Sequence, residues 1–155
     1  MKFLFRGFVS VAVSLLLLWF TITPAEAFMF KFSGTRPDNL GVRNGTLAAC
    51  PASPNCVSTY STDTEHQIEP LKFLGGNTIA TLKAAILAQP GAVVISETEN
   101  YLYAEFTSSL MGFVDDVEFY VDETSGTVQA RSASRLGESD LGVNRKRIEA
   151  IRSLM

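Results

Sequence analysis

The sequence predicts an α+β domain: a four- to five-stranded antiparallel sheet with two helices on one face, preceded by a long irregular segment. Four segments between residues 93 and 135 show the strand pattern and are joined by links of hairpin length. One helical pattern precedes these segments and another follows the last of them. Residues 33–65 are rich in turn formers and hold no regular period. The predicted order is strand, helix, four strands, helix, with one sheet face left open.

The first 27 residues have the features of a secretory signal peptide. Lys2 and Arg6 precede an apolar run over residues 8–22, and A-E-A at 25–27 supplies the small residues of a cleavage site. The run is shorter than the ~20 residues that a membrane-spanning helix needs. We therefore expect export and cleavage, with contact to a membrane only through this segment before cleavage; an uncleaved anchor is the alternative.

Composition limits the partners of the mature chain, residues 28–155. Without Lys2, Arg6 and Glu26, the 13 basic and 16 acidic residues of the whole chain become 11 and 15, a net charge of −4. The length fits one domain with a core of its own. An acidic exported protein is a poor candidate for nucleic acid, so the expected partner is an unknown protein or a small ligand.

Cys50 and Cys56 lie in C-P-A-S-P-N-C, within the predicted irregular segment 28–66. An even number of cysteines in an exported protein usually forms a bridge, so we expect a structural disulfide. A redox couple or thiol sensor is the alternative, although the spacing is not C-x-x-C. The segment is either disordered or draped over the fold, and its apolar residues favour draping. The α+β domain proper is expected over 67–155.

The first elements of this domain follow in order. Residues 68–74 form a short strand, which Pro70 confines to an edge of the sheet. Asn77 or Thr78 caps a helix that a Pro-Gly pair ends at 90–91. A strand with alternating apolar residues comes next.

The remaining strands are expected at 101–108, 113–121 and 127–135. Asp140 then caps a helix over 141–154. Its apolar stripe consists of Leu141, Asn144, Ile148, Ile151 and Met155, in which Asn144 is polar.

Charge is separated along these strands. Residues 97–123 hold eight acidic residues and no Lys or Arg, whereas residues 128–155 hold six of the mature chain's basic residues. A register that pairs apolar residues across the sheet places Arg131 beside Glu118. Opposite charges paired across strands stabilise a sheet by ~0.2–1 kcal/mol each.

The predicted binding site is the sheet face without helices. The eight candidate binding residues are Tyr101, Tyr103, Glu105, Asp116, Glu118, Tyr120, Arg131 and Arg135. Tyrosine and arginine together are typical of binding hot spots. Two alternatives remain: a solvated face whose charges only balance each other, and a face covered by residues 33–65.

Asp115 is expected on the opposite, apolar face, where an unpaired charge is costly. We therefore predict a buried network that docks the last helix on the sheet. Its members are Asp115, Ser132, Ser134, Asp140, Asn144 and Arg145.

Signals for catalysis or metal binding are weak. His66 is the only histidine, so a Ser-His-Asp arrangement is not expected. Glu105, Asp116 and Glu118 are ligands of the type that calcium takes, but the neighbouring arginines argue against a cation. No catalytic residue, metal or cofactor is predicted.

Four motifs resemble those of the DUF1499 family. They are R-P-D-N-L-G-V at 36–42, C-P-A-S-P-N-C-V-S at 50–58, G-F-V-D-D-V-E-F at 112–119 and R-S-A-S-R-L-G-E-S-D-L-G-V-N-R-K-R at 131–147. This bacterial and plant family is named for its unknown function. The resemblance implies an exported setting, the periplasm or a thylakoid lumen, and no established activity.

Three hypotheses follow for the function. The favoured one is a non-catalytic binding or accessory protein that uses the open sheet face. The second is an enzyme with an Asp- and Arg-lined pocket closed by residues 33–65. The third is a thiol-disulfide element that uses Cys50 and Cys56.

Overall fold

The computed structural model describes residues 31–155, so the predicted signal peptide lies outside the described residues. Six strands form one antiparallel sheet. They are β1 (Cys56–Ser58), β2 (Leu71–Lys72), β3 (Ala92–Glu97), β4 (Tyr101–Thr107), β5 (Val114–Asp122) and β6 (Thr127–Ser134). The helices are α1 (Thr78–Leu87), which follows a 3-10 turn η1 (Gly75–Asn77), and α2 (Val143–Arg152).

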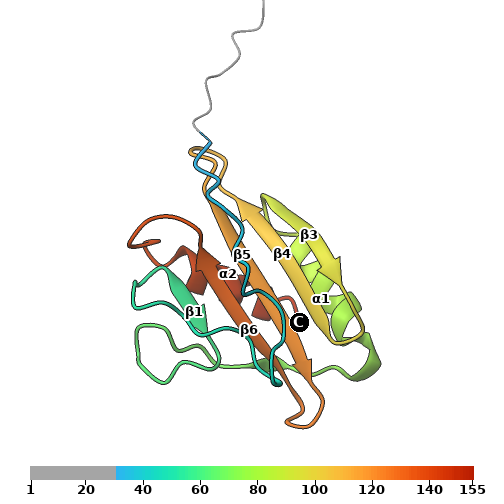
Figure 1. The fold of residues 1–155 in the computed structure, drawn as a ribbon. Helices are drawn as coiled ribbons and strands as arrows, with labels where there is room; N and C mark the ends of the chain where they lie inside the picture. The colour runs from blue at the N-terminus through green and yellow to red at the C-terminus, as the bar shows by residue number, and fades with distance from the viewer. Residues whose placement is uncertain (1–30) are drawn as a thin grey trace, which may run out of the picture.

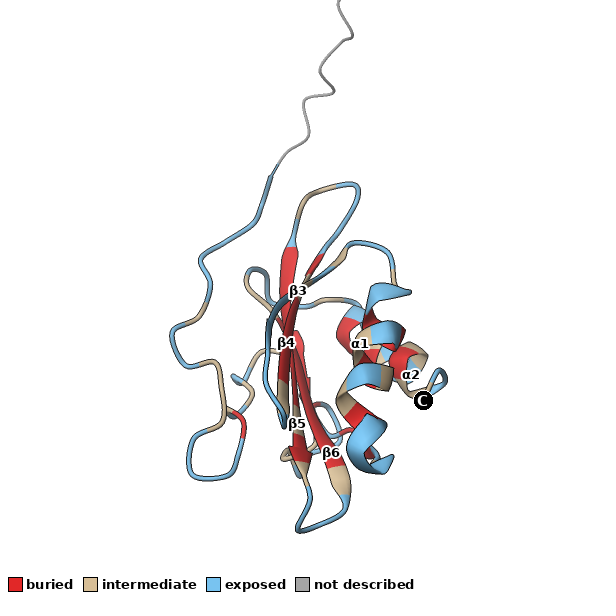
Figure 2. Cartoon of the chain, turned by 90° about the vertical axis from the view of Figure 1, so that its right-hand side faces the viewer, coloured by how far each residue is buried: buried red, intermediate tan, exposed pale blue. Residues whose placement is uncertain are grey.

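The strands lie in the order β1-β6-β5-β4-β3, and β2 also pairs with β6 (Figure 1). Hairpins connect β3 through β6, as their short links predict. Both helices lie on one face of the sheet, and the chain leaving residue 31 runs down the other (Figure 2). The predicted α+β class with two helices is confirmed, and the predicted order of strand, helix, four strands and helix is observed from β2 onwards.

The main core lies between the helices and the sheet. Leu82 and Ile86 of α1 and Ile148 and Ile151 of α2 are fully buried, at the i, i+3 and i+4 spacings of a helix that packs by one face. Phe119 of β5 is the largest fully buried side chain beneath them. Burial of each such side chain contributes about 1.5–3 kcal/mol, which fixes both helices on this face.

The strand β1 lies in the segment that the sequence predicts to be irregular. Its residues Cys56, Val57 and Ser58 pair with 131–133 of β6. Three residues are too few to display an alternating period, and this strand exists because β6 offers an unpaired edge. The sheet therefore extends across the predicted boundary at residue 67.

The helix α2 begins two residues later than predicted. Leu141 precedes it with φ = 55°, in the left-handed region, and is 85% exposed. Leu141 therefore does not belong to the buried stripe, whereas Asn144 is fully buried in it. Among the residues that the structure describes, neither helix is long and apolar enough to span a membrane.

Candidate functional site

The N-terminal segment covers the sheet face opposite the helices. Residues 31–50 run along this face. The Gly41 amide donates a hydrogen bond to Oε1 of Glu118 at 2.6 Å. Arg36 forms an ion pair with Glu105, with 2.6 Å between Nη2 and Oε1. The segment thus supplies donors to carboxylates that project from the strands.

This coverage corrects the prediction of an open face. Asp116, Glu118 and Arg131 are buried, and Glu118 has no exposed surface. A charged group without water must find its partners inside the protein. The alternative in which residues 33–65 cover the face is the arrangement observed.

Arg135 lies at the centre of the first of two polar clusters on this face. Its Nε donates to Oδ2 of Asp116 at 2.9 Å, and its Nη2 donates to Oδ1 at 2.7 Å. The same Nη2 also contacts Glu105 and lies 3.2 Å from the hydroxyl of Tyr103. That hydroxyl lies 2.6 Å from Asp116 and can donate to it. Two carboxylates therefore share one buried arginine.

These contacts hold the first cluster in its charged form. The hydrogen bond to Asp116 raises the pKa of Arg135 above its usual value. Burial alone would raise the pKa of Glu105, but hydrogen bonds from Arg135 and Arg36 outweigh it and lower the pKa. Burial, and then the hydrogen bonds to the two carboxylates, raise the pKa of the Tyr103 hydroxyl, which stays protonated. The cluster is electrostatically satisfied.

The second cluster surrounds Glu118. Its Oε1 accepts hydrogen bonds from the Gly41 amide and, at 2.8 Å, from the Tyr101 hydroxyl. Burial, and then the charge of Glu118, raise the pKa of Tyr101, so this hydroxyl also remains a donor. Oε2 of Glu118 faces Nη1 of Arg131 at 3.4 Å, which is long for a charge-assisted hydrogen bond.

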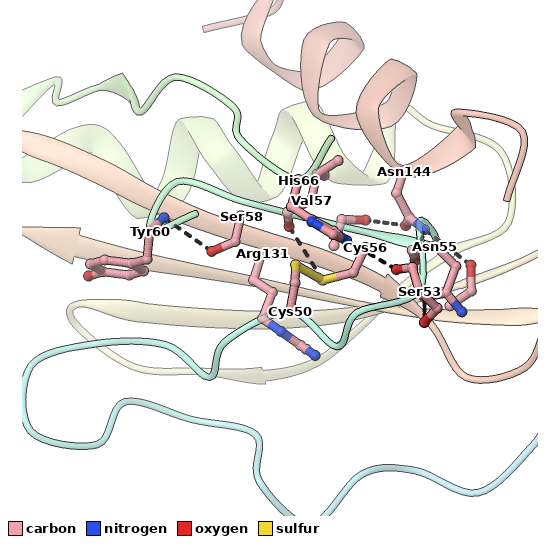
Figure 3. Close-up of a disulfide and its surroundings, with 12 residues drawn as sticks. Cys50, Ser53, Asn55, Cys56, Val57, Ser58, Tyr60, His66, Arg131 and Asn144 are labelled. Carbon is pink, nitrogen blue, oxygen red and sulfur yellow. Dashed lines mark hydrogen bonds between the residues drawn. A yellow bond between two sulfur atoms is a disulfide. The ribbon is translucent and has the colours of Figure 1, made fainter. Parts of the chain in front are cut away.

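Arg131 is the least satisfied charged residue on this face. Its side chain is only 6% exposed. Within residues 31–155, its Nε is the one buried side-chain nitrogen or oxygen without a hydrogen-bond partner. Leaving a buried donor unpaired costs about 1–3 kcal/mol. Figure 3 shows this guanidinium beside Cys50, on the side of β6 away from α2.

A pocket of about 370 Å³ opens at this guanidinium. Residues of the covering segment, of the disulfide loop and of the sheet line it together: Thr35, Pro37 and Asn39; Ala49, Cys50 and Pro51; Asp116, Arg131 and Arg135. Its size is at the lower end of small-molecule sites. The Arg131 guanidinium therefore borders a small cavity, while its unpaired Nε itself has less than 1 Å² of accessible surface.

The structure brings seven of the eight candidate binding residues into the two clusters. Tyr120 is the exception, since it pairs with Gln129 on β6 and is half-buried beyond them. The prediction did not include Arg36 and Gly41. Both belong to the R-P-D-N-L-G-V motif, which could have marked them as candidates. The motif does not show which strand this segment crosses.

On the helix face, Arg147 rather than Arg145 pairs with Asp115. Arg147 also donates to Ser132 at 3.0 Å. Arg145 instead bonds the main-chain carbonyl of Gln67 at 2.7 Å. Position 147 lies nearer the buried stripe than 145 does, because it is three residues after Asn144 and four before Ile151.

The remaining members of the predicted network surround Asn144. Its Nδ2 donates to Ser134 at 3.1 Å, and its Oδ1 accepts from Ser132 at 2.5 Å. Oδ2 of Asp140 accepts the Asn144 amide at 2.7 Å and so caps the helix from outside its first turn. Asn144 also donates to the carbonyl of Asn55, next to β1. This network ties α2 to β6 and to the disulfide loop.

The disulfide loop has its own support. The predicted bridge between Cys50 and Cys56 is present. His66 lies against the loop, with Nδ1 2.7 Å from Oδ1 of Asp63 and Nε2 3.2 Å from the carbonyl of Ser53. Both partners are acceptors, so the imidazole fits best with both nitrogens protonated. Burial alone would lower the pKa of His66, but these two hydrogen bonds outweigh it and raise the pKa.

A second hollow of about 780 Å³ also borders this loop. It is lined mainly by hydroxyl-bearing and small residues, with His66 at its wall. Both nitrogens of His66 are engaged, and the Ser58 hydroxyl accepts the amide of Tyr60 at 3.2 Å. The one carboxylate in its lining, Asp63, would repel an anion, so this hollow is a poorer site for an oxyanion than the Arg131 pocket.

One family model matches the chain: "Protein of unknown function (DUF1499)", over residues 46–155. The match includes β1 through α2 and both cysteines, and it leaves out the part of the covering segment before Thr46. No curated protein and no solved structure matches the chain.

Proposed function

This chain belongs to the DUF1499 family, a family of unknown function, and from that premise we propose that it is an exported binding protein for a small oxyanion. The ligand occupies the pocket between the covering segment and the sheet. A carboxylate or a phosphate group receives hydrogen bonds from Arg131. This proposal keeps the binding role that the sequence suggests and moves it from an open face to an enclosed pocket.

The unpaired Nε of Arg131 carries this proposal. A guanidinium has five N–H donors in a planar fork, which matches the two oxygens of a carboxylate or phosphate. Arg131 makes one long hydrogen bond to Glu118 within the described residues. An oxyanion bound at this guanidinium would supply an acceptor to Nη2 and, once the side chain turns toward the cavity, to Nε as well.

The Arg135 cluster supports this role by ordering the floor of the pocket. Asp116 receives hydrogen bonds from Arg135 on both oxygens and lies 2.6 Å from the Tyr103 hydroxyl. A carboxylate held in this way is a poor general base, because its lone pairs are already in use. The geometry therefore supports binding more strongly than the rival enzyme.

Export is part of the proposal. The A-E-A sequence at 25–27 and the disulfide between Cys50 and Cys56 are both typical of proteins that reach an oxidising compartment. Cys56 is buried in β1, which supports a structural bridge over a thiol-disulfide element. The periplasm and the thylakoid lumen both fit.

Arginine side-chain NMR tests this function directly. The ¹⁵N-labelled protein is titrated with acetate, succinate and inorganic phosphate at constant ionic strength, and the Nε–H signal of Arg131 is followed. The signal is assigned by its loss in Arg131→Lys. We expect it to shift in a saturable way, and the comparison of probes separates carboxylate from phosphate recognition.

Two variants serve as controls. Arg131→Lys keeps the charge but loses the fork, so the affinity should fall roughly tenfold or more. Isothermal titration calorimetry measures the affinity of both variants, because Arg131→Lys lacks the Nε–H signal. Arg145→Lys, whose guanidinium bonds the Gln67 carbonyl on the other face, should bind as the parent does. If no probe shifts the signal, or if both variants lose affinity equally, the proposed site is wrong.

A further inference from the structure

One end of the molecule exposes large apolar side chains. The loop between β4 and β5, residues 108–113, reads S-S-L-M-G-F and contains no charged residue. Leu110 at its tip is 80% exposed, and Phe113 is exposed as well. Single exposed leucines are common, but a charge-free loop tip with several of them is typical of an interaction site.

This loop is ordered rather than loose. The amide of Ser108 donates to the carbonyl of Phe113 at 2.9 Å, and the amide of Gly112 donates to the carbonyl of Ser108 at 3.0 Å. The Ser108 hydroxyl accepts the Phe113 amide at 3.0 Å. The backbone bonds therefore hold Leu110 outward.

Two other segments add apolar residues at the same end. Phe32 stacks on Phe113 with 5.3 Å between ring centroids, and its amide donates to the carbonyl of Met111. On the helix side, Val143 joins residues 107–109 in the wall of a cleft of about 680 Å³. Leu141, two residues before it, points into solvent from a left-handed backbone. A non-glycine residue in that conformation is uncommon and often marks a functional position.

The route of the chain indicates what this end faces. The described residues begin beside this loop, at the end where the preceding chain joins them (Figure 1). The apolar run ends at Ile22, ten residues before Phe32. Ten residues reach at most about 35 Å. Any membrane that holds the run during export therefore lies within reach of the Leu110 loop.

The charges nearby fit a lipid interface only in part. Lys146 lines the cleft beside the loop and forms no ion pair within the described residues, and Lys31 adjoins Phe32. Glu138 and Asp140 lie near Leu141 in the sequence and offset both of these charges. Insertion of apolar side chains, rather than attraction to anionic headgroups, would then supply most of the affinity.

We propose that this apolar end is a membrane-contact surface that inserts Leu110 and Leu141 into the lipid interface. The surface is separate from the Arg131 pocket, and either proposal stands without the other. The partner is the bilayer itself, so the proposal extends membrane contact beyond the signal segment to which the sequence-based prediction confines it.

A tryptophan reporter tests this contact in the full chain. Trp19 is the only tryptophan, so Trp19→Phe gives a protein without tryptophan fluorescence. Leu110→Trp is then compared with Leu154→Trp. Leu154 is also exposed, and it lies near β2, since the neighbouring Arg152 bonds the carbonyl of Pro70. Both variants carry the same apolar run, so any difference between them reports on the orientation of the domain.

The vesicles are made of phosphatidylcholine with brominated acyl chains. We expect the reporter at position 110 to shift to shorter wavelength and to lose at least half of its emission, while the reporter at 154 stays unchanged. An equal response from both positions, or none at 110, overturns the proposal.

A second measurement does not depend on the apolar run. The buried core of the described residues extends from Leu47 to Ile151, so the chain without residues 1–27 keeps it. Flotation of this chain with phosphatidylcholine vesicles should fall at least tenfold in Leu110→Glu with Leu141→Glu, and should not change in Leu154→Glu. No vesicle binding by the parent overturns the proposal. So does a dimer that the double variant dissociates without vesicles, because the surface then joins two copies.

Discussion

The Arg131 guanidinium lies 3.4 Å from the Glu118 carboxylate, although the two residues face each other directly across β5 and β6. Arg135, a short distance along the same face, bonds Asp116 with two nitrogens. Of the two arginines, Arg135 therefore uses most of its N–H donors within the fold, whereas Arg131 has N–H donors without an acceptor. At Glu118 the Gly41 amide and the Tyr101 hydroxyl occupy Oε1, so Oε2 alone is left to Arg131.

The two arginines should differ in their effect on stability. Arg135→Gln leaves Asp116 and Glu105 without their shared cation, which should cost ~3–5 kcal/mol. Arg131→Gln leaves Glu118 with two hydrogen bonds, which should cost only ~1–2 kcal/mol. Urea denaturation of both variants measures the free energies of unfolding. Equal losses would mean that Arg131 contributes as much to the stability of the fold as Arg135 does.

A similar contrast is expected on the helix face. Arg147→Gln removes the partner of the buried Asp115 and should cost ~3 kcal/mol or more. Arg145→Gln loses only hydrogen bonds to main-chain carbonyls at the surface and should cost about 1 kcal/mol. Thermal denaturation of the two variants decides which arginine docks α2. A larger loss of stability in Arg145→Gln than in Arg147→Gln would favour Arg145, the residue that the sequence predicts, as the partner of Asp115.

Much of the fold could be predicted because its signals are local. The β4–β5 and β5–β6 hairpins have short links, and the alternation of apolar residues places Glu118 opposite Arg131. The strand β1 could not be predicted, since its three residues acquire strand geometry only by pairing with β6. Its existence depends on tertiary contacts that no short window contains.

The site was less predictable for the same reason. Alternation along β4, β5 and β6 identifies which side chains share a face, but nothing local shows that Gly41 crosses Glu118, 77 residues away. The choice between Arg145 and Arg147 could have been made from helical spacing. Arg147 is three residues after Asn144 and four before Ile151, so it lies nearer the buried stripe than Arg145 does.

Removal of the disulfide should weaken both the fold and the pocket. The bridge closes a seven-residue loop between Cys50 and Cys56, and the double variant Cys50→Ser with Cys56→Ser should lose about 2 kcal/mol. Cys50 also forms a wall of the Arg131 pocket, so the oxyanion titration should show weaker binding. Denaturation and the NMR titration measure the two effects separately. Unchanged binding in a destabilised variant would show that the loop keeps its position without the bridge.

His66 should make stability depend on pH near neutrality. Its pKa is raised in the folded protein, because hydrogen bonds to Asp63 and to the Ser53 carbonyl outweigh the burial that alone would lower it. A raised folded pKa stabilises the fold fully below the unfolded value of about 6.5. That stabilisation is lost as the pH rises through the folded pKa, which lies above it. We therefore expect the free energy of unfolding of the parent to fall, relative to His66→Gln, as the pH rises above about 6.5.

Asp63→Asn is the matched control for this prediction, because it removes the principal partner of His66 and should abolish most of the slope. The contribution of Asp63 itself is lost only as the pH falls through its lowered pKa, below 3.8, and so does not interfere. A parent curve parallel to that of His66→Gln above about pH 6.5 would mean that the folded protein does not raise the pKa of His66.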